Sequence, residues 1–536
     1  MLFKLVTSLA GSLSAYLLYK VCKAIYDELA SPIRQLPGPK STHWFFGNFK
    51  QMRDDHNSGL EERWVKEYGP TMKVHRLLGI SSPYTIDTKA IHHIISNTDI
   101  YQKSEAARFF LGRVVGPGIL VVEDEQHKHQ RKIMNPAFGA PQVRELTSIF
   151  VDTSIQLRDI WAAQAASNGG VARVEILSWL SKATLDIIGL AGFNYRINAL
   201  GTDGNDTPDE LAQAFETLVT PFEFNLMVFL RFQFPLFRRI PTKRDKEFIN
   251  AQATMARIGR KLLAQSKREI AENGTFETGH GRDLLTLLVR ANTSKEIPVN
   301  QRLSDEDVLA QVPTFLVAGH ETTSTALTWV LFALTQNIAA QQRLREELMN
   351  VSTDNPSMDE LNELKYLDCV VRETLRLYAP VPSTIRTAMR DDVVPLGTPV
   401  TDTRGTVHES LRIRKGERVF IPILALNHDM GIWGPDAMEF IPERWERSTP
   451  IANSIPGVWG HMLTFLGGPR SCIGYRFSLV ETKALLFTLI RAFEFELAVP
   501  IRDIGKKSTD LVQRPIVLSE RAKGNQMPLL VRSVGR

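Results

Sequence analysis

Mostly apolar side chains recur at helical spacing over long stretches of the chain. Between residues 143 and 161 they follow one another at intervals of three or four, which predicts a helix with one buried face. The residues of this stripe are Val143, Leu146, Phe150, Ser154, Leu157 and Trp161. A second stripe covers residues 361–378. We expect that helix to end before Pro380 and Pro382, because proline cannot continue a helix.

Strand patterns are shorter and fewer. Segments 71–76 and 84–87 alternate in polarity or carry β-branched and aromatic residues, and they flank a Gly-Ile-Ser-Ser-Pro turn. This pattern predicts two paired strands. Further short strands are expected within 384–425 and after Phe493. The fold class that these patterns predict is mainly α with small β-sheets.

The N-terminal segment is apolar enough to suggest a membrane anchor. Residues 5–19 carry no charge, and residues 2–22 would extend about 31 Å as a helix, enough to cross a hydrocarbon core. A cleaved signal peptide, with a site near Ser14 and Ala15, is the alternative. We therefore divide the chain into an anchor at 1–24, a linker at 25–39 that contains a stiff Pro-Gly-Pro hinge, and one catalytic domain at 40–536.

The segment 215–237 is rich in phenylalanine and does not follow one helical stripe. Its phenylalanines are at 215, 222, 224, 229, 232, 234 and 237, interrupted by Pro221 and Pro235. Such a segment can be ordinary core, or it can form an apolar cover over a pocket that also touches a membrane. The pattern leaves both readings open.

Composition excludes several classes of protein. Apolar residues make up 43% and charged residues 23% of the 536 residues, which excludes a disordered or fibrous chain. The net charge of +5 suits an acidic partner or an anionic membrane surface, and it is too small to indicate nucleic-acid binding. The three cysteines are far apart in the sequence, so neither a disulfide framework nor a zinc cluster is expected.

One cysteine stands in a distinctive context. The run from Phe465 to Gly474 reads FLGGPRSCIG, and it precedes an amphipathic stretch at 475–492 that predicts a helix. A helix N-terminus and the neighbouring Arg470 both stabilise a thiolate at Cys472. A thiolate held in this way can be a metal ligand or a nucleophile, although His461 is the only histidine close in sequence that could activate a nucleophile. An inert buried cysteine is the alternative.

This run resembles the haem-binding signature of the cytochrome P450 family of haem-thiolate monooxygenases. All five fixed positions match, and they are Phe465, Gly468, Arg470, Cys472 and Gly474. The resemblance implies the cytochrome P450 fold, preceded here by the N-terminal transmembrane anchor. It also implies haem b as cofactor, with the iron ligated by the Cys472 thiolate.

A second stretch resembles the oxygen-activating motif of the same family. Residues 318–323 read AGHETT and follow an acidic pair, Asp305 and Glu306, after which we expect a helix to begin. By the resemblance, Ala318 and Gly319 leave room for a diatomic molecule above a flat cofactor. Glu321 and Thr322 would be the catalytic residues that relay protons to it. Thr323 should point away, because successive helical residues are about 100° apart.

Two further motifs support the resemblance. Glu373 and Arg376 lie three residues apart on one helix face, and the family closes this pair with an arginine that matches Arg444. Taken alone, Glu373 and Arg376 could be an ordinary surface pair. The family usually has phenylalanine after that arginine, where this chain has Trp445.

The remaining resemblance concerns the haem propionates. His127 and Arg131 share a helix face, and with Arg386 and Arg470 they match the positions that bind propionates in the family. The family more often has tryptophan at the position of His127. A solvated helix residue is therefore the alternative for His127.

The resemblance implies a monooxygenase that inserts one oxygen atom of O2 into a lipophilic molecule. The anchor and hinge are similar to those of microsomal members. They imply a single-pass protein of the endoplasmic reticulum membrane with a cytosolic catalytic domain. The implied electron donors are NADPH-cytochrome reductase, a flavoprotein, and cytochrome b5. A haem-thiolate isomerase or dehydratase that does not use O2, and a non-catalytic haem-binding protein, are the alternative functions.

The sequence leaves the substrate open. The segments expected to line the pocket are mostly apolar, which suggests a terpenoid or other secondary metabolite, a steroid, a fatty acyl compound or an aromatic xenobiotic; they are 101–121, 215–237, 314–317, 381–385 and 511–512. Glycosylation sequons at Asn205, Asn273, Asn292 and Asn350 would stay unused in a cytosolic domain.

Overall fold

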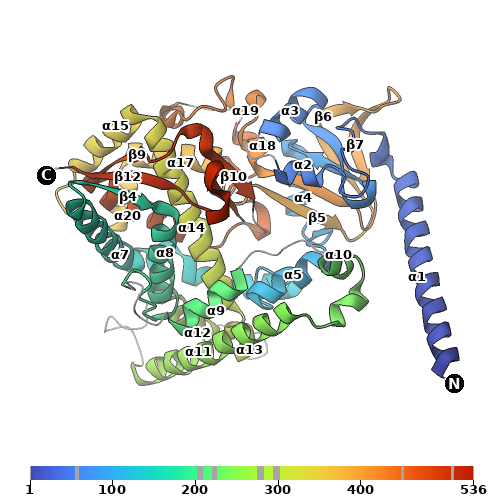
Figure 1. Cartoon of the computed structure of the whole chain (residues 1–536), viewed down its shortest axis with the longest axis horizontal. Helices are drawn as coiled ribbons and strands as arrows, with labels where there is room; N and C mark the ends of the chain where they lie inside the picture. Colours follow the sequence, from blue (N-terminus) through green and yellow to red (C-terminus); the bar gives the residue numbers. More distant parts are fainter. Residues whose placement is uncertain are drawn as a thin grey trace. The chain divides into compact units, whose positions relative to one another are not determined.

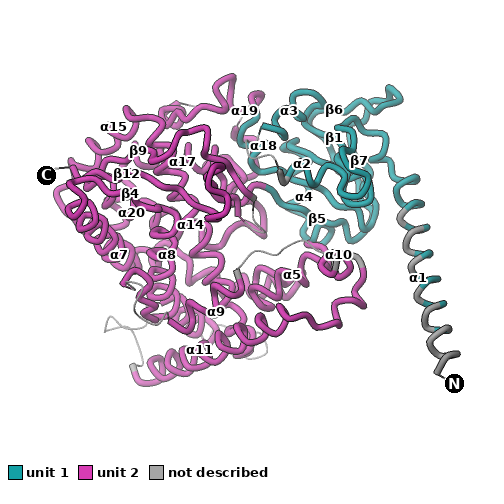
Figure 2. The backbone as a smooth tube through the Cα atoms, viewed as in Figure 1, with its two compact units in different colours: residues 1–102, 383–429 teal, residues 103–382, 430–536 magenta. Residues whose placement is uncertain are grey.

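The computed structural model describes residues 2–54, 59–201, 209–219, 226–273, 283–293, 298, 302–447, 452–508 and 512–534. Asn205, Leu511 and the phenylalanines at 222 and 224 lie outside these residues. The chain divides into two compact units, of residues 1–102 with 383–429 and of residues 103–382 with 430–536 (Figure 2). Figure 1 shows the elements of both units.

The first unit is built on a five-stranded sheet with the order β1-β2-β8-β5-β3. Its strands are β1 (Thr71–His75), β2 (Ser81–Thr85), β3 (Tyr101–Gln102), β5 (Ser383–Ala388) and β8 (Arg418–Pro422), and a separate hairpin joins β6 (Asp392–Thr401) to β7 (Val407–Ile413). Its helices are α1 (Leu2–Ala30), α2 (Phe49–Asp54), α3 (Gly59–Tyr68), α4 (Thr88–Ser96) and α18 (Ile423–Asn427), with the 3-10 turns η1 (Pro32–Gln35) and η2 (Leu77–Gly79).

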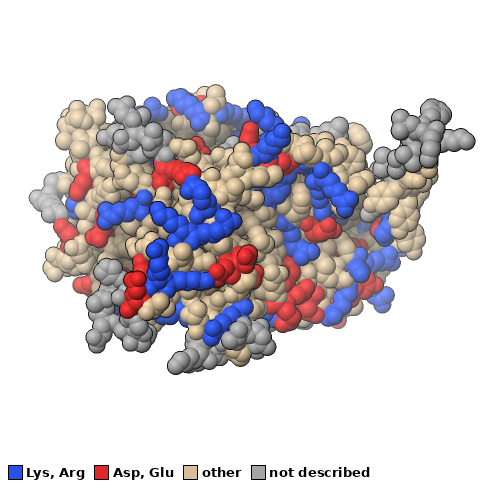
Figure 3. All heavy atoms as spheres, turned by 90° about the horizontal axis from the view of Figure 1, so that it is seen from below, with Lys and Arg blue, Asp and Glu red and all other residues tan. Residues whose placement is uncertain are grey.

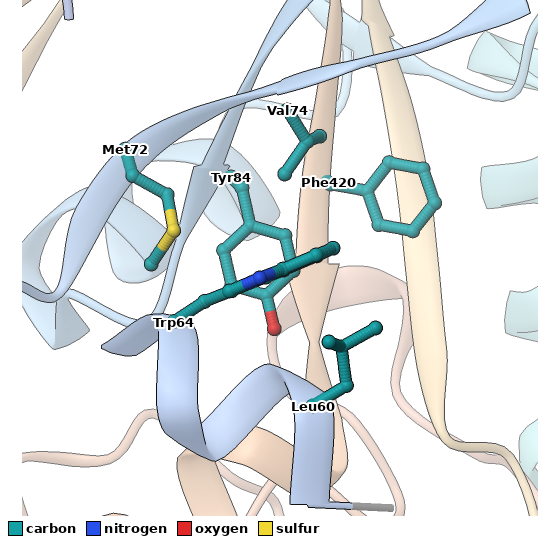
Figure 4. Close-up of a cluster of buried hydrophobic side chains, with 6 residues drawn as sticks. All are labelled: Leu60, Trp64, Met72, Val74, Tyr84 and Phe420. Carbon is teal, nitrogen blue, oxygen red and sulfur yellow. The ribbon is translucent and has the colours of Figure 1, made fainter. Parts of the chain in front are cut away.

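The core of the first unit lies between α3 and the sheet. Leu60 and Trp64 of α3 pack on the side chains of β1, β2 and β8 (Figure 4). The strands there contribute Met72, Val74, Tyr84 and Phe420. The predicted hairpin is present, but its second strand begins at Ser81 rather than at residue 84. The chain reverses earlier, at residues 76–80, where Leu78 and Gly79 adopt left-handed backbone conformations.

The second unit is mostly helical. Its longer helices are α5 (Glu105–Val115), α6 (Asp124–Met134), α7 (Ala140–Ser167), α8 (Ile176–Phe193), α9 (Glu210–Val219), α10 (Leu226–Gln233), α11 (Lys243–Asn273), α12 (Leu284–Thr293), α14 (Gln311–Gln336), α15 (Ile338–Met349), α17 (Lys365–Leu377) and α20 (Tyr475–Ala492). Its shorter ones are α13 (Asp305–Leu309), α16 (Met358–Glu363), α19 (Met430–Trp433), η3 (Asn135–Phe138), η4 (Pro235–Arg239), η6 (Pro442–Glu446), η7 (Ala452–Ser454), η8 (Gly468–Arg470), η9 (Ile501–Asp503) and η10 (Leu518–Lys523).

Two small sheets complete the second unit. Strands β4 (Val171–Glu175), β12 (Pro528–Ser533) and β9 (Phe493–Leu497) form an antiparallel sheet, and β10 (Ile504–Ser508) pairs with β11 (Gln513–Val517). A mainly helical fold with small sheets agrees with the class expected from the sequence.

The helix predicted from residues 143–161 is confirmed as part of α7, and every residue of its stripe is buried. The helix predicted over 361–378 is wrong as one element. It is divided into α16 and α17 at Leu364, which has an extended backbone with ψ 97°. The Glu347 carboxylate accepts hydrogen bonds from the backbone amides of Tyr366 and Leu367, at 2.7 and 2.8 Å, and so starts α17 as a new helix.

The helix expected after Asp305 and Glu306 is likewise two helices. The acidic pair lies inside α13, and α14 begins at Gln311. Pro313 lacks the amide hydrogen that would continue the hydrogen bonds of α13, which explains why the chain restarts there.

The described residues contain one helix that is long and apolar enough to cross a membrane, α8, and 72% of it is buried inside the protein. It packs against α14 and α7, so its apolar composition serves the core. Helix α1 extends to Ala30, so the linker expected from residue 25 begins as helix.

Charged side chains of both signs lie side by side on the face drawn in Figure 3. Exposed ion pairs join neighbouring helices, such as Lys267 of α11 with Asp305 of α13, at 2.6 Å, and Arg257 of α11 with Glu210 of α9. Exposed pairs of this kind contribute about 0–1 kcal/mol each, so they have little part in holding the fold.

Candidate active site

Cys472 lies in a closed loop between η8 and α20. Its amide donates a hydrogen bond to the carbonyl oxygen of Phe465 at 2.8 Å. Gly468 has a φ of +66°, and Leu466, which is not a glycine, has a φ of 54°. Side-chain-bearing residues adopt such angles only where their surroundings fix them. The loop before Cys472 is therefore held in one conformation.

The Cys472 thiol is accessible and yet desolvated. Its residue is exposed. Burial nevertheless raises the pKa of the Cys472 thiol, while a hydrogen bond from the Gly474 amide and the positive charge of Arg131 lower it. The Gly474 amide and Arg131 are suited to stabilise the thiolate form that ligates a metal.

Gly474 contributes to the site through its backbone amide, which donates a hydrogen bond to the Cys472 thiol. A Cβ added there would lie 3.8 Å from Phe138, which is ordinary contact. The ring of Phe465 packs edge-on against Trp459, at 5.7 Å between centroids, and its carbonyl holds Cys472. Both motif residues therefore shape the loop around the sulfur.

Three basic side chains gather beside this loop. The Arg131 guanidinium on α6 donates to the carbonyl and, at 3.3 Å, to the hydroxyl oxygen of Ser471. Arg470 pairs with Glu123, and its buried Nε atom has no hydrogen-bond partner among the described residues. His127 is 6% exposed, and burial, followed by Arg470, Lys103 and Arg131, lowers its pKa to about 4.

This set of residues fits an anionic group next to the thiol. The cations that depress the pKa of His127 attract carboxylates, and the Arg470 Nε hydrogen is a donor in need of an acceptor. The alternative reading of His127 as a solvated helix residue is wrong, because its side chain is buried. A haem group, with two propionates and an iron that takes an axial thiolate, matches this donor set.

Arg386 belongs to the first unit and is described there by itself. It lies in β5, is 5% exposed, and donates to the Thr384 hydroxyl at 2.5 Å and to the Ile385 carbonyl at 3.0 Å. Its expected contact with a propionate stays a prediction.

Most residues of helix α14 are buried, but its motif has one face that is accessible to solvent. Ala318 is exposed and Thr322, one turn later, is partly exposed, whereas the residues around them are mostly buried. The Thr322 hydroxyl donates to the Ala318 carbonyl at 2.6 Å. Gly319 does not belong to this face. A Cβ there would lie 2.9 Å from the Ile188 side chain, so the glycine lets α8 approach α14 closely.

The other residues of this turn face neighbouring elements. The Thr323 hydroxyl lies 3.1 Å from that of Ser478 on α20. His320 Nε2 lies 2.6 Å from the Ser181 hydroxyl of α8. Burial and the nearby Arg514 lower the pKa of His320 to about 3, so its ring is neutral at physiological pH.

Glu321 has a partner that the sequence did not indicate. Its carboxylate pairs with Arg514 of β11 at 2.8 Å, and both side chains are largely buried. Arg514 is almost 200 residues away and lies in no recognisable motif, so only the folded structure identifies it.

The structure brings Glu373, Arg376 and Arg444 together. Arg376 donates to Glu373 from Nη2 at 2.7 Å and from Nε at 3.0 Å, and Arg444 Nε donates to Glu373 at 3.3 Å. Glu373 and Arg376 are 0% exposed, so the reading as a surface pair is wrong. Arg444 also pairs with Asp436 at 2.7 Å.

Trp445 is part of this network. Its indole Nε1 donates to Glu373 at 3.0 Å, where the expected phenylalanine would have no donor. Its ring also lies 5.5 Å from that of Trp433, which receives the Arg376 guanidinium on its face. The substitution of tryptophan for phenylalanine therefore adds a hydrogen bond in addition to changing the packing.

The phenylalanine-rich segment has both buried and exposed apolar residues among those described, and its part as a cover over a pocket stays a prediction. Phe215 of α9 is buried and meets the His320 ring edge-on at 5.0 Å, as core. Further along, Leu236 and Ile240 are 57% and 44% exposed. Arg231, which stands among the phenylalanines, is buried and pairs with Asp245 at 2.6 Å.

Comparison with known proteins agrees with this geometry. The model of the family described as Cytochrome P450 matches residues 37–518. Cytochrome P450 monooxygenase 205 of Postia placenta is 51% identical over 98% of this chain and 97% of its own length. Cytochrome P450 monooxygenase 128 of the same fungus is 51% identical over 97% and 96%. Cytochrome P450 monooxygenase claW of Ampulloclitocybe clavipes is 36% identical over 93% and 92%.

We predict that Trp445→Phe lowers the free energy of unfolding by about 1–2 kcal/mol, because one buried hydrogen bond to a charged carboxylate is lost. Glu373→Ala should cost more, about 3–5 kcal/mol, because it leaves two buried guanidinium groups without their common acceptor. Urea unfolding followed by tryptophan fluorescence and by the haem absorbance measures both. Equal stability of Trp445→Phe and the wild type would show that the indole hydrogen bond has no net effect.

Proposed function

The chain belongs to the cytochrome P450 family, and from this premise we propose that it inserts one oxygen atom of O2 into a lipophilic small molecule. Members of the family bind haem b through an axial cysteine thiolate, and its relatives are named monooxygenases. The observations that support the proposal are the exposed residue Cys472 and the accessible residues Ala318 and Thr322 of α14, which belong to the same unit.

We propose that the haem-binding residues hold the group in two ways, by ligating its iron and by pairing with its negatively charged propionates. When bound, haem b supplies the iron that binds and activates O2. Cys472 would hold the iron, and Arg131, Arg470 and His127 would hold the propionates. The Gly474 amide and Arg131 lower the pKa of the thiol, which favours the thiolate required for ligation. Arg386 of the first unit is proposed as a further propionate ligand.

Glu321 and Thr322 are the proposed catalytic residues. The Thr322 hydroxyl hydrogen is taken up by the Ala318 carbonyl, so its oxygen is left to accept a hydrogen bond from a water molecule on the accessible face. The Arg514 guanidinium stabilises Glu321 as a carboxylate, which can take a proton and release it to that water. This assigns proton delivery to residues of the chain.

The apolar residues beside the α14 motif support an apolar substrate. Phe315 and Val317 are buried apolar residues of this part of the helix, and the Thr314 hydroxyl donates to the Val115 carbonyl at 3.2 Å. We propose that the substrate is a lipophilic secondary metabolite such as a terpenoid. A steroid, a fatty acid and an aromatic xenobiotic are the other lipophilic candidates. Screening such compounds for a shift of the haem absorbance in the purified protein tests the assignment.

We propose that α1 anchors the protein in the endoplasmic reticulum membrane, with the domain at 40–536 in the cytosol. Its 29 residues extend about 44 Å, enough to cross a hydrocarbon core. Leu18, Tyr19 and Leu29 are about 60% exposed along it. Glu28, near its end, accepts hydrogen bonds from the Ser81 amide and hydroxyl at 2.8 and 2.7 Å, which fastens the helix to β2. The proposed electron donors are NADPH-cytochrome reductase and cytochrome b5.

We predict that Cys472→Ser removes the thiolate signature from the spectrum of the reduced carbon monoxide complex. A serine oxygen is a much harder ligand than a thiolate and donates less electron density to iron. Cys369→Ser is the matched control, since Cys369 is buried elsewhere in the same unit. A Cys472→Ser protein that kept the thiolate spectrum would disprove the assignment of the iron ligand.

We predict that Thr322→Ala keeps the fold and the haem content but sends a larger share of the NADPH consumed into hydrogen peroxide. Loss of the hydroxyl removes an acceptor for the water that delivers protons, at a typical cost of about 10²-fold in product formation. Thr328→Val is the control, because Thr328 makes the same backbone hydrogen bond two turns away, at 2.8 Å to Ser324. Normal coupling in Thr322→Ala would count against the relay and in favour of a reaction that does not activate O2.

We predict that deletion of residues 2–24 releases the protein from membranes while Glu28 keeps its contacts with Ser81. Flotation of the full chain and of the deletion variant with lipid vesicles measures the difference. Asn350 is exposed and reports orientation. Asn292 cannot report it, because its side chain is buried and bonded to the backbone of Leu303. A glycan on Asn350 would place the domain on the lumenal side.

A further inference from the structure

Glu481 of α20 is a buried carboxyl group that the proposed reaction does not use. Its side chain is 0% exposed, and neither oxygen has a hydrogen-bond partner of ordinary geometry among the described residues. The nearby cation Lys483 pairs with Asp368 instead, at 2.9 Å. An ionised carboxylate buried without a cation is strongly unfavourable. Burial raises the pKa of Glu481 well above its ordinary value, and the Thr323 hydroxyl offsets only part of that shift.

The place of Glu481 in the fold connects the two helices of the site. Thr323 of α14 lies 3.1 Å from the Ser478 hydroxyl, and Glu481 follows Ser478 by one turn on the same face of α20. Helix α20 begins three residues after Cys472, and Thr323 directly follows Thr322. Thr323, Ser478 and Glu481 thus lie between the helix that follows the thiol and the helix that carries the proposed relay.

The rotation of α14 depends on this interface. Successive residues are about 100° apart around a helix, so Thr322 and Thr323 face different neighbours. Gly319 against Ile188 and His320 against Ser181 hold the side of α14 that faces α8, and the Thr323 contact with Ser478 helps to hold the side that faces α20. Thr322 lies on the accessible face while these contacts are kept.

We propose that Glu481 is a positioning residue whose uncharged carboxylic acid joins Thr323 and Ser478 into one hydrogen-bonded link and so holds α14 with Thr322 on its accessible face. The link itself is a property of the fold. Its consequence for proton delivery rests on the function proposed for Thr322. A protonated carboxyl has a donor and an acceptor, as an amide has, whereas an ionised carboxylate has acceptors alone.

The first test asks whether Glu481 carries a proton. Infrared spectra of the haem-loaded full-length protein should contain a carboxylic acid C=O band that is missing from Glu481→Gln. The band should persist between about pH 6 and pH 8, where ordinary glutamates are ionised. The absence of any band that Glu481→Gln removes would overturn the proposal.

The second test measures how firmly α14 is held. Backbone amide hydrogen exchange at residues 318–323 should be about fivefold faster in Glu481→Leu, as expected for the loss of one buried hydrogen bond. Glu481→Gln should exchange like the wild type, because an amide can form the same link. Thr488→Val is the matched control, since Thr488 is a buried residue two turns further along α20.

Wild-type exchange in Glu481→Leu, or equal acceleration in Glu481→Gln and Glu481→Leu, would overturn the proposal. Ser478→Ala, which breaks the link without placing an apolar side chain at position 481, serves if Glu481→Leu does not fold. It should show the same local acceleration, and wild-type exchange in that variant would equally overturn the proposal.

The yield of hydrogen peroxide separates this proposal from the function of Thr322. Faster exchange together with more peroxide in Glu481→Leu supports both the link and the relay. Faster exchange with an unchanged peroxide yield supports the link and counts against the relay at Thr322. The two proposals can therefore fail independently.

Discussion

The close packing of α14 against α8 and α20 is the constraint on which the site depends. Gly319 allows Ile188 to approach to a distance that a Cβ would not permit, and Thr323 meets Ser478 across the other interface. These contacts hold the rotation of the helix in which Ala318 is exposed and Thr322 is partly exposed. A small change in that rotation would bring a different residue to the accessible face, since each position differs by about 100° from the next.

The buried carboxyl groups near these helices differ in the partners that compensate the cost of their burial. Glu373 is fully buried and accepts hydrogen bonds from two arginines and from Trp445, which compensates the cost of removing its charge from water. Glu321 is paired with the Arg514 guanidinium at 2.8 Å. Glu481 forms no ion pair among the described residues, and burial raises its pKa. Three buried carboxyl groups of one unit thus have three different environments, which suit structural, proton-transfer and positioning roles respectively.

The sequence predicted the elements whose signals are local. The apolar stripe of α7, the helix that follows Cys472 and the hairpin of β1 and β2 are present, because side-chain periodicity and turn residues act over a few neighbours. The breaks at Leu364 and between α13 and α14 were missed. The first depends on Glu347, a residue of another helix that caps α17, and no periodicity reports such a partner.

The sequence by itself determined the cysteine motif, the acid and hydroxyl of the α14 motif, and the family to which they point. The folded chain alone decided which side chains meet across helices: Arg514 with Glu321, Trp445 with Glu373, and Thr323 with Ser478 near Glu481. The folded chain also explains why residue 319 is a glycine. A side chain there would collide with Ile188 of α8, so the glycine allows α8 to pack closely and does not serve to leave space for a ligand. These pairs are separated by tens to hundreds of residues. Their contact depends on how whole helices pack, and packing is decided by the shape of many side chains at once rather than by any local pattern.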